Sequence, residues 1–301
     1  MYPLLLDTSA KYALWGGKRI NKLLGFDNSV PAAMVGIFSG NCGFKNGDLK
    51  EETLLNFAQN DKTDFFGKNF VREEKFPVNV SIVDAYDRTP IGVSNKDRII
   101  YVADADENSE IILGFNRNVY SETLIKEYEN SALAEKCNFV KVKKGDVLTV
   151  PAGIIHAIGR GILCYIISSG NEKFYTISDY GRTDTFGRKE KIDINGALSV
   201  LDLSRFNSFY DDNSDLSLYP FGTVNDKQIE NIGVSFVKLN GTVGINNRNS
   251  FTCVIPTCGE AKLSYPSGSM ELVNGNAVLF PKSTTLKING YSDFFVITLK
   301  D

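Results

Sequence analysis

Short runs of alternating apolar and polar residues, separated by turn residues, recur along most of this chain. A period of two places successive side chains on opposite faces of a strand, so each run predicts a half-buried β-strand. Gly, Pro, Asp and Lys fill the connectors, as tight turns require. The predicted strands cover residues 78–83, 98–103, 110–113, 138–142, 146–150 and 162–168, and then 234–239, 251–256, 261–265, 269–272, 277–280, 285–288 and 294–299.

Helical spacing is limited to three short segments. Residues 48–58 have Asp48 as a possible cap, and residues 121–128 begin at Ser121, another favoured capping residue. The third segment is 194–203, and none of the three exceeds a few turns. The chain is therefore predicted to be mainly β, with a few short helices outside jelly-roll barrels.

The predicted strands fall into two groups on either side of a polar, aromatic stretch, residues 204–226. Residues 272–281 repeat the pattern of residues 142–151: a Gly-centred turn, an apolar strand and then proline. At about 150 residues per domain, 301 residues suit two units. We predict a first domain over 1–203, an irregular linker over 204–230 and a smaller second barrel over 231–301.

Charge and composition exclude some classes of binding partner. The 33 Lys and Arg residues nearly balance the 36 Asp and Glu residues, and no basic stripe is present, so we expect no nucleic-acid or membrane partner. A small polar ligand is expected instead. The start of the chain lacks a signal-peptide pattern, and no window approaches about 18 apolar residues, so a cytoplasmic location is expected. The five cysteines contain no Cys-x-x-Cys pair and are predicted to be small buried apolar residues.

His156 is the only histidine of the chain. It lies in Val-Pro-Ala-Gly-Ile-Ile-His-Ala, residues 150–157, a strand-turn-strand pattern typical of a histidine at the mouth of a sugar-enzyme β-barrel. One histidine cannot form a histidine-rich metal site. His156 therefore either faces a cavity, with or without a metal, or is a core histidine with satisfied hydrogen bonds.

Several motifs, taken in order, resemble the class I mannose-6-phosphate isomerases in their short bacterial form, which belong to the cupin superfamily. The resemblance covers nearly the whole chain and implies two cupin-like jelly-roll barrels, of which the first is catalytic. The motifs are Leu-Trp-Gly-Gly at 14–17, Leu-Gly-Phe at 24–26, Lys-Phe-Pro at 75–77, the His156 segment, and Ser-Asp-Tyr-Gly-Arg at 178–182.

The resemblance also implies a reaction and a site. That family interconverts mannose 6-phosphate and fructose 6-phosphate, and a zinc ion bound by two histidines, a glutamate and a further side chain holds the sugar. A cation stabilises the enediolate-like transition state formed when a proton moves between C1 and C2. On this resemblance His156 is a metal ligand and Arg182 is the catalytic arginine near the reacting end of the sugar. Tyr180, in the same motif, is assigned to substrate binding.

The chain departs from the family at the metal site. Ser81 stands at the position of a family lysine, and Gly92 and Ser94 stand at the positions of a glutamine or lysine and of the first ligand histidine. Arg98 aligns with the ligand glutamate, so His156 is the only family metal ligand that this sequence keeps. Two like charges about 4 Å apart repel by about 4 kcal/mol at an effective dielectric constant of 20, so Arg98 opposes any cation there. We expect no cofactor, or zinc only if the family site is retained.

Ser94, Arg98, His156, Tyr180 and Arg182 are thus the predicted sugar contacts. Strand alternation predicts that Arg98 shares one face with residues 100 and 102 and points inward. Arg182 has two possible roles. It either binds an oxygen of the sugar or of its phosphate, or forms a structural ion pair with Asp179 or Glu190. The run 188–191 either attracts a phosphate or is a solvated face, and Gly-Arg-Gly at 159–161 is predicted to be a hairpin turn rather than a phosphate loop.

Two hypotheses follow. In the first, the protein is an isomerase of carbohydrate metabolism with weak or altered activity, His156 and Arg182 lie in the site, and other ligands complete a metal centre. In the second, it is a metal-free sugar or sugar-phosphate binding protein that senses its ligand without converting it.

Overall fold

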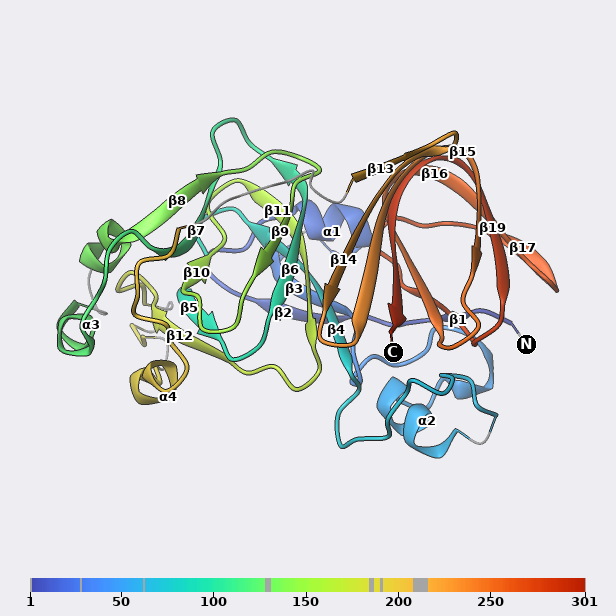
Figure 1. Ribbon diagram of the computed structural model, residues 1–301, viewed down its shortest axis with the longest axis horizontal. Coiled ribbons are helices and arrows are strands. Elements are labelled where there is room, and N and C mark those ends of the chain that lie inside the picture. Colours follow the sequence, from blue (N-terminus) through green and yellow to red (C-terminus); the bar gives the residue numbers. More distant parts are fainter. Residues whose placement is uncertain are drawn as a thin grey trace.

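The computed structural model describes residues 2–27, 29–61, 63–127, 131–183, 187–189, 192–207 and 216–300. Strands β2 to β12 form one unit, and β1 together with β13 to β19 forms a second unit beside it (Figure 1). The described helices are short and lie at the periphery. The predicted fold class, mainly β with a few short helices, is confirmed.

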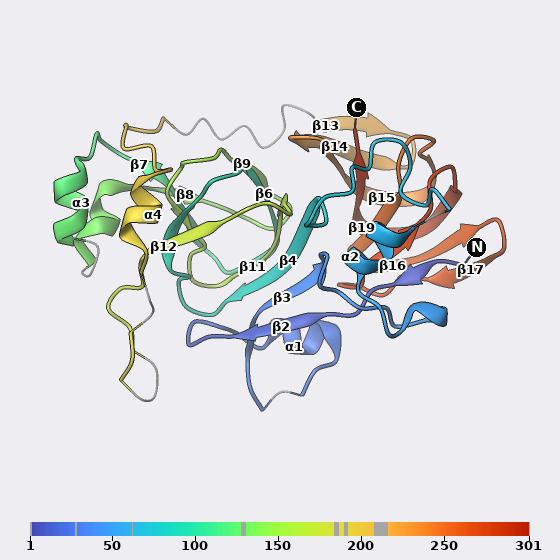
Figure 2. The same ribbon diagram turned by 90° about the horizontal axis from the view of Figure 1, so that it is seen from below.

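The first unit consists of two antiparallel sheets that face each other, and their strands surround its interior (Figure 2). Side chains of both sheets share one hydrophobic core, but within the described residues the sheets are not joined into one closed hydrogen-bonded barrel. The six-stranded sheet has the order β2 (Ser9–Tyr12), β3 (Ala32–Phe38), β4 (Val78–Ala85), β11 (Ile162–Ser169), β6 (Arg98–Ala105) and β9 (Val147–Val150). The five-stranded sheet has the order β12 (Phe174–Ser178), β5 (Ile91–Ser94), β10 (His156–Ala157), β7 (Glu110–Phe115) and β8 (Cys137–Lys141).

The second unit is a single curved eight-stranded antiparallel sheet. Its path is β1 (Leu4–Leu5), β18 (Val278–Phe280), β16 (Thr252–Tyr265), β19 (Thr285–Leu299), β15 (Ile232–Asn246), β14 (Gly222–Ile229) and β13 (Leu216–Tyr219), and β17 (Gly268–Glu271) pairs with β16.

Two predictions about this sheet are wrong: the extent of the linker before it and the number of its long strands. Residues 216–229, predicted as part of the linker 204–230, form the β13–β14 hairpin, and β14 pairs with β15 along its whole length. Residues 208–215, the centre of that predicted linker, lie outside the described residues. The strand pairs predicted at 251–256 and 261–265, and at 285–288 and 294–299, are each one continuous strand, because a bulge after Pro256 and the left-handed Gly290 bend the ladder without ending it.

The central strands β4 and β11 of the six-stranded sheet are largely buried on both faces, which explains their nearly continuous apolar sequences. Ile100 and Val102 of β6 pack into the core of the first unit, as the alternation predicted. Ile99 and Tyr101 belong instead to the core shared with the second unit, where the ring of Tyr101 stacks on Phe236 with centroids 5.3 Å apart. The register of β6 therefore directs Arg98 to the interior of the first unit.

The helices only partly match their predicted bounds. α3 (Ser121–Glu127) lies where it was predicted, and α4 (Ile194–Leu198) is shorter than the predicted 194–203. The helix predicted from Asp48 begins later as α2 (Leu54–Asn60), because Thr53 is the residue whose hydroxyl accepts the capping hydrogen bond from Asn56 N, at 3.2 Å. Two 3₁₀ helices, η1 (Gly47–Leu49) and η2 (Ser131–Lys136), and α1 (Arg19–Leu24) were not predicted.

Two smaller findings complete the fold. No helix in the described part of the chain is both long enough and apolar enough to span a membrane. The cysteines are free thiols, and all but Cys258 are buried, as predicted for small apolar core residues.

Candidate functional site

A cavity of about 970 Å³ opens on the inner face of the six-stranded sheet. Its floor is polar because one row of paired residues, Asn79 of β4, Ser168 of β11 and Arg98 of β6, presents side chains to the same face. Ser81, at the position of the family lysine, lies two residues along β4 and also lines the cavity. The volume suits a small-molecule ligand.

Arg98 and His156 meet at the inner end of this cavity. The His156 side chain is buried, and Arg98 Nη1 lies 3.0 Å from His156 Nε2. Because a guanidinium can only donate, Nε2 accepts this hydrogen bond, and Nδ1 carries the ring proton that it donates to Ile154 O at 2.8 Å. Burial, and then the charge of Arg98, lower the pKa of His156 to about 3. His156 is therefore a neutral imidazole.

Glu172 completes this centre and was not predicted. It lies in the turn between β11 and β12, and its carboxylate forms an ion pair with Arg98 Nε. Burial opposes its ionisation, but the charge of Arg98 and hydrogen bonds from Arg98 and Ser168 outweigh burial, so the pKa of Glu172 lies below its ordinary value. No motif marks Glu172, since the contact depends on a turn that brings position 172 to position 98.

The ring of Phe174 covers the same centre. It lies 4.4 Å from the Arg98 guanidinium carbon, measured to the ring centroid, and its centroid lies 5.5 Å from that of the His156 ring. A Cβ at Gly92 would stand only 2.4 Å from Phe174 Cζ and 2.5 Å from the carbonyl oxygen of Tyr175. The absence of a side chain at Gly92 therefore makes room for Phe174.

Ser94 was predicted to contact the sugar, but it is not among the residues that line the cavity. Its buried hydroxyl donates to Lys96 O at 2.7 Å and accepts from Lys96 N at 3.0 Å, which closes a tight local turn. Ser94 instead lies beside the Glu172 carboxylate.

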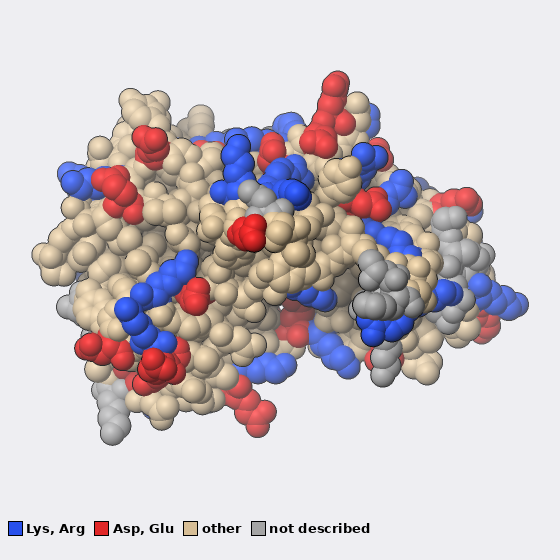
Figure 3. All heavy atoms as spheres, turned by 180° about the vertical axis from the view of Figure 1, so that it is seen from behind, with Lys and Arg blue, Asp and Glu red and all other residues tan. Residues whose placement is uncertain are grey.

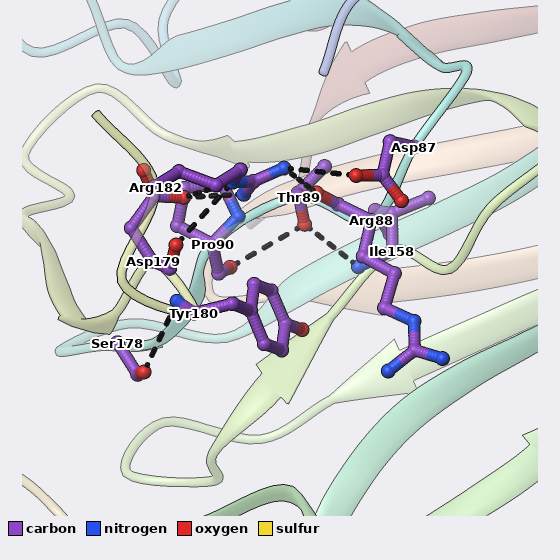
Figure 4. A network of polar contacts seen from close by, with 9 residues as sticks. All are labelled: Asp87, Arg88, Thr89, Pro90, Ile158, Ser178, Asp179, Tyr180 and Arg182. Carbon is purple, nitrogen blue, oxygen red and sulfur yellow. Dashed lines mark hydrogen bonds and ion pairs between the residues drawn. The ribbon is translucent and has the colours of Figure 1, made fainter. Parts of the chain in front are cut away.

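Arg182 lines the cavity, but each of its guanidinium nitrogens already has a protein partner (Figure 4). It forms an ion pair with Asp179, donates to Arg88 O at 2.8 Å, and lies 3.5 Å from Asp87. Of the two alternatives for Arg182, the structure has the ion pair with Asp179. Glu190, the other predicted partner, lies outside the described residues.

Tyr180 was also predicted to bind substrate, yet it does not line this cavity. Its backbone has a positive φ of 54°, and its ring lies 5.3 Å from the Arg182 guanidinium carbon, measured to the ring centroid (Figure 4). The same residue lines a separate, smaller cavity. The motif spacing placed Tyr180 beside Arg182 but could not show that Tyr180 lines a different cavity.

The donors at the inner end do not fit a zinc site. Zinc requires three or four ligands in a tetrahedral array, whereas the only free imidazole nitrogen of His156 faces a guanidinium and the Ser94 hydroxyl is held by Lys96. Within the described residues, no group of three or more His, Cys, Asp or Glu side chains lies together as a metal site. Arg98 supplies the positive charge at this point.

The charged side chains around the cavity are mostly basic, although the whole chain carries a net charge of −3. Among the described residues, the basic lining residues are Lys11, Arg98, Lys173, Arg182, Arg188 and Lys189, and the acidic ones are Glu172, Asp179 and Asp193. On the outer face shown in Figure 3, basic and acidic side chains are interspersed instead. Residues 159–161 form a turn between β10 and β11, with Gly161 at a φ of 79°. The prediction of a hairpin is wrong, because β10 and β11 belong to different sheets and do not pair with each other.

Comparison with known proteins gives a consistent set of relatives. The chain is 24% identical to mannose-6-phosphate isomerase ManA of Bacillus subtilis over 98% of both chains. It is 28% identical to a mannose-6-phosphate isomerase of Streptococcus mutans over 67% of this chain and 69% of that one. A scan against models of protein families finds no match.

Solved structures agree with the sequence relatives. The mannose 6-phosphate isomerase of Bacillus subtilis superposes with a TM-score of 0.87 at 22% identity over 99% of each chain. A putative mannosephosphate isomerase of Archaeoglobus fulgidus gives 0.80 at 18% identity, over 100% of this chain and 99% of that one.

The fold is thus that of a two-unit, cupin-like β protein with a ligand-sized cavity in its first unit. The sequence relatives support its membership of the mannose-6-phosphate isomerase family, as the motifs predicted.

Proposed function

We propose that this protein is a metal-independent sugar-phosphate binding member of the mannose-6-phosphate isomerase family. The observation that carries the proposal is the 3.0 Å contact between Arg98 Nη1 and His156 Nε2. A guanidinium at this place provides fixed positive charge and directional donors for ligand oxygens. The names of the relatives supply the ligand class, a hexose 6-phosphate.

The cavity supports binding of such a ligand. Its basic residues favour a phosphate, and its floor of Asn79, Ser81 and Ser168 offers hydrogen bonds to hydroxyl groups. Trp15 and Phe174 also line it and provide apolar ring surfaces for the carbon skeleton. The N–H groups of Arg98 not used by Glu172 and His156 remain for the ligand.

The same residues are poorly suited to isomerisation. Moving a proton between C1 and C2 requires a base whose pKa lies near the working pH and an electrophile for the developing oxyanion. Glu172 is the carboxylate nearest the centre, and its lowered pKa makes it a weak base. His156 donates its only ring proton to Ile154 O and cannot also protonate a ligand. We infer that the protein binds the sugar phosphate without isomerising it.

The test is calorimetric titration of the purified protein with mannose 6-phosphate, fructose 6-phosphate and unphosphorylated mannose. We expect binding of the phosphorylated sugars, weakened by salt, and no conversion of mannose 6-phosphate with or without added zinc, cobalt or manganese. Elemental analysis is expected to find no stoichiometric zinc. Metal-dependent turnover, or one zinc per chain that is lost in His156→Ala, would overturn the proposal in favour of an altered isomerase. Absence of binding to every hexose phosphate would overturn it too.

A further inference from the structure

A second cavity, of about 170 Å³, lies behind the wall of the first and is not used by the proposed function. Ala157 and Ile158 line both cavities, so the two share a wall. Arg88, Arg160 and Tyr180 surround the second cavity together with Ser109 and Glu110.

The Tyr180 hydroxyl is an unused donor at this place. Its oxygen is buried and has no hydrogen-bond partner within the described structure, although a buried hydroxyl nearly always has one. Burial raises the pKa of Tyr180 to about 12, so the hydroxyl keeps its proton at neutral pH. The ring is held there by a left-handed backbone at Tyr180 and Gly181, an unfavourable conformation for a bulky residue.

The two arginines have no acidic partner here. Arg88 lies over the Tyr180 ring, with 5.9 Å from its guanidinium carbon to the centroid, and Arg160 lies 5.8 Å over the ring of Tyr86. Neither forms an ion pair with any described carboxylate. In Figure 4 the Arg88 guanidinium points away from Arg182, whose Nη1 donates to the Arg88 carbonyl oxygen. Glu110 offsets one of the two positive charges, which leaves the lining net positive.

We propose that this cavity binds a phosphate-sized oxyanion, to which Tyr180 donates its hydroxyl hydrogen bond while Arg88 and Arg160 supply charge. A tetrahedral oxyanion accepts several hydrogen bonds at once, so a single ion has acceptors for the unpartnered hydroxyl and for both guanidinium groups. This site is separate from the sugar-phosphate cavity and does not depend on Arg98.

The experiment is a titration of the whole protein with inorganic phosphate, with chloride used to hold ionic strength constant, followed by tyrosine ultraviolet difference absorbance. Tyr180→Phe keeps the ring and removes only the hydroxyl, so its titration isolates this site from any phosphate binding in the first cavity. We expect a saturable tyrosine signal that is lost in Tyr180→Phe. Arg160→Gln is expected to weaken binding about tenfold or more, as for a lost charged hydrogen bond.

Arg248→Gln is the matched control, because Arg248 is an exposed arginine in the second unit and its loss changes the net charge equally. It should leave the phosphate affinity unchanged. An identical signal in Tyr180→Phe, no signal at all, or an equal loss of affinity in Arg248→Gln and Arg160→Gln would overturn the proposal.

Discussion

Disruption of the ion pair between Arg98 and Glu172 gives the strongest quantitative test of the centre formed by Arg98, His156 and Glu172. Only 11% of the Arg98 side chain and 10% of the Glu172 side chain are exposed, so Arg98→Met leaves a nearly buried carboxylate without its partner. Removing one member of a buried pair costs about 3–5 kcal/mol. With an unfolding entropy of about 2.1 cal/mol/K per residue, this corresponds to a fall in Tm of roughly 5–8 °C for a chain of this length.

The assay is a double-mutant cycle by calorimetry or urea unfolding, with Arg98→Met, Glu172→Gln and the double variant. The double variant should be more stable than Arg98→Met alone, because a neutral amide replaces the unpaired carboxylate. We expect a coupling energy of about 2 kcal/mol or more between the two positions.

The exposed ion pair between Lys96 and Glu230, 2.6 Å apart, is the control. Their side chains are 35% and 38% exposed, so Lys96→Met should cost less than about 1 kcal/mol. Additive effects at Arg98 and Glu172, with a coupling energy below about 0.5 kcal/mol, would refute the argument that this pair organises the centre.

Two further predictions concern His156 and Gly92. The pKa of His156 is about 3 in the folded protein against an ordinary 6.5, so only the unfolded state gains a proton between these values. Stability should therefore fall by about 1.4 kcal/mol per pH unit on acidification from pH 6.5 toward 3, and urea titrations of His156→Gln should lack this part of the slope. Gly92→Ala should lose about 1–3 kcal/mol by urea unfolding, because its Cβ would stand 2.4 Å from Phe174 Cζ. Gly36→Ala is its control, since the nearest atom to a Cβ there is 3.9 Å away, and equal losses in both variants would contradict the steric argument.

The sequence allowed prediction of those features that depend on local periodicity. Alternation in β6 put Arg98 on the face of Ile100 and Val102, and the structure has that register. Glu172 and Phe174 could not be predicted, because they meet Arg98 only when the β11–β12 turn folds over the cavity. The order of the motifs also gave no information about where the Tyr180 side chain lies. Its backbone has a positive φ, and its ring lines the second cavity.

Strand continuity was the other feature hidden from the sequence. Gly290 carries a φ of 149° inside β19 and pairs with Gly241 of β15. Glycines in a pattern normally indicate a turn, but here the paired glycines let two long strands bend together. The long-range pairing therefore overrides the local signal that divided β19 into two predicted strands.

The side chains at the inner end of the cavity depend on one another. Arg98 requires Glu172 to balance its charge, and His156 can accept from Arg98 only as the neutral tautomer that Ile154 O selects. Phe174 can cover this pair only because position 92 has no side chain.

A site that had lost its ligands by drift would leave buried polar groups unpaired, which is costly. The described side-chain atoms that are buried without a partner are those of Tyr165, Tyr180, Asn225 and Asn274, and none belongs to this centre. Its buried polar groups are satisfied by contacts that exclude a cation, and guanidinium donors of Arg98 are left facing the cavity. Under the proposed function, this fixed arrangement suits recognition of a ligand better than chemical change to it, because it holds its protons tightly and supplies no base of suitable pKa.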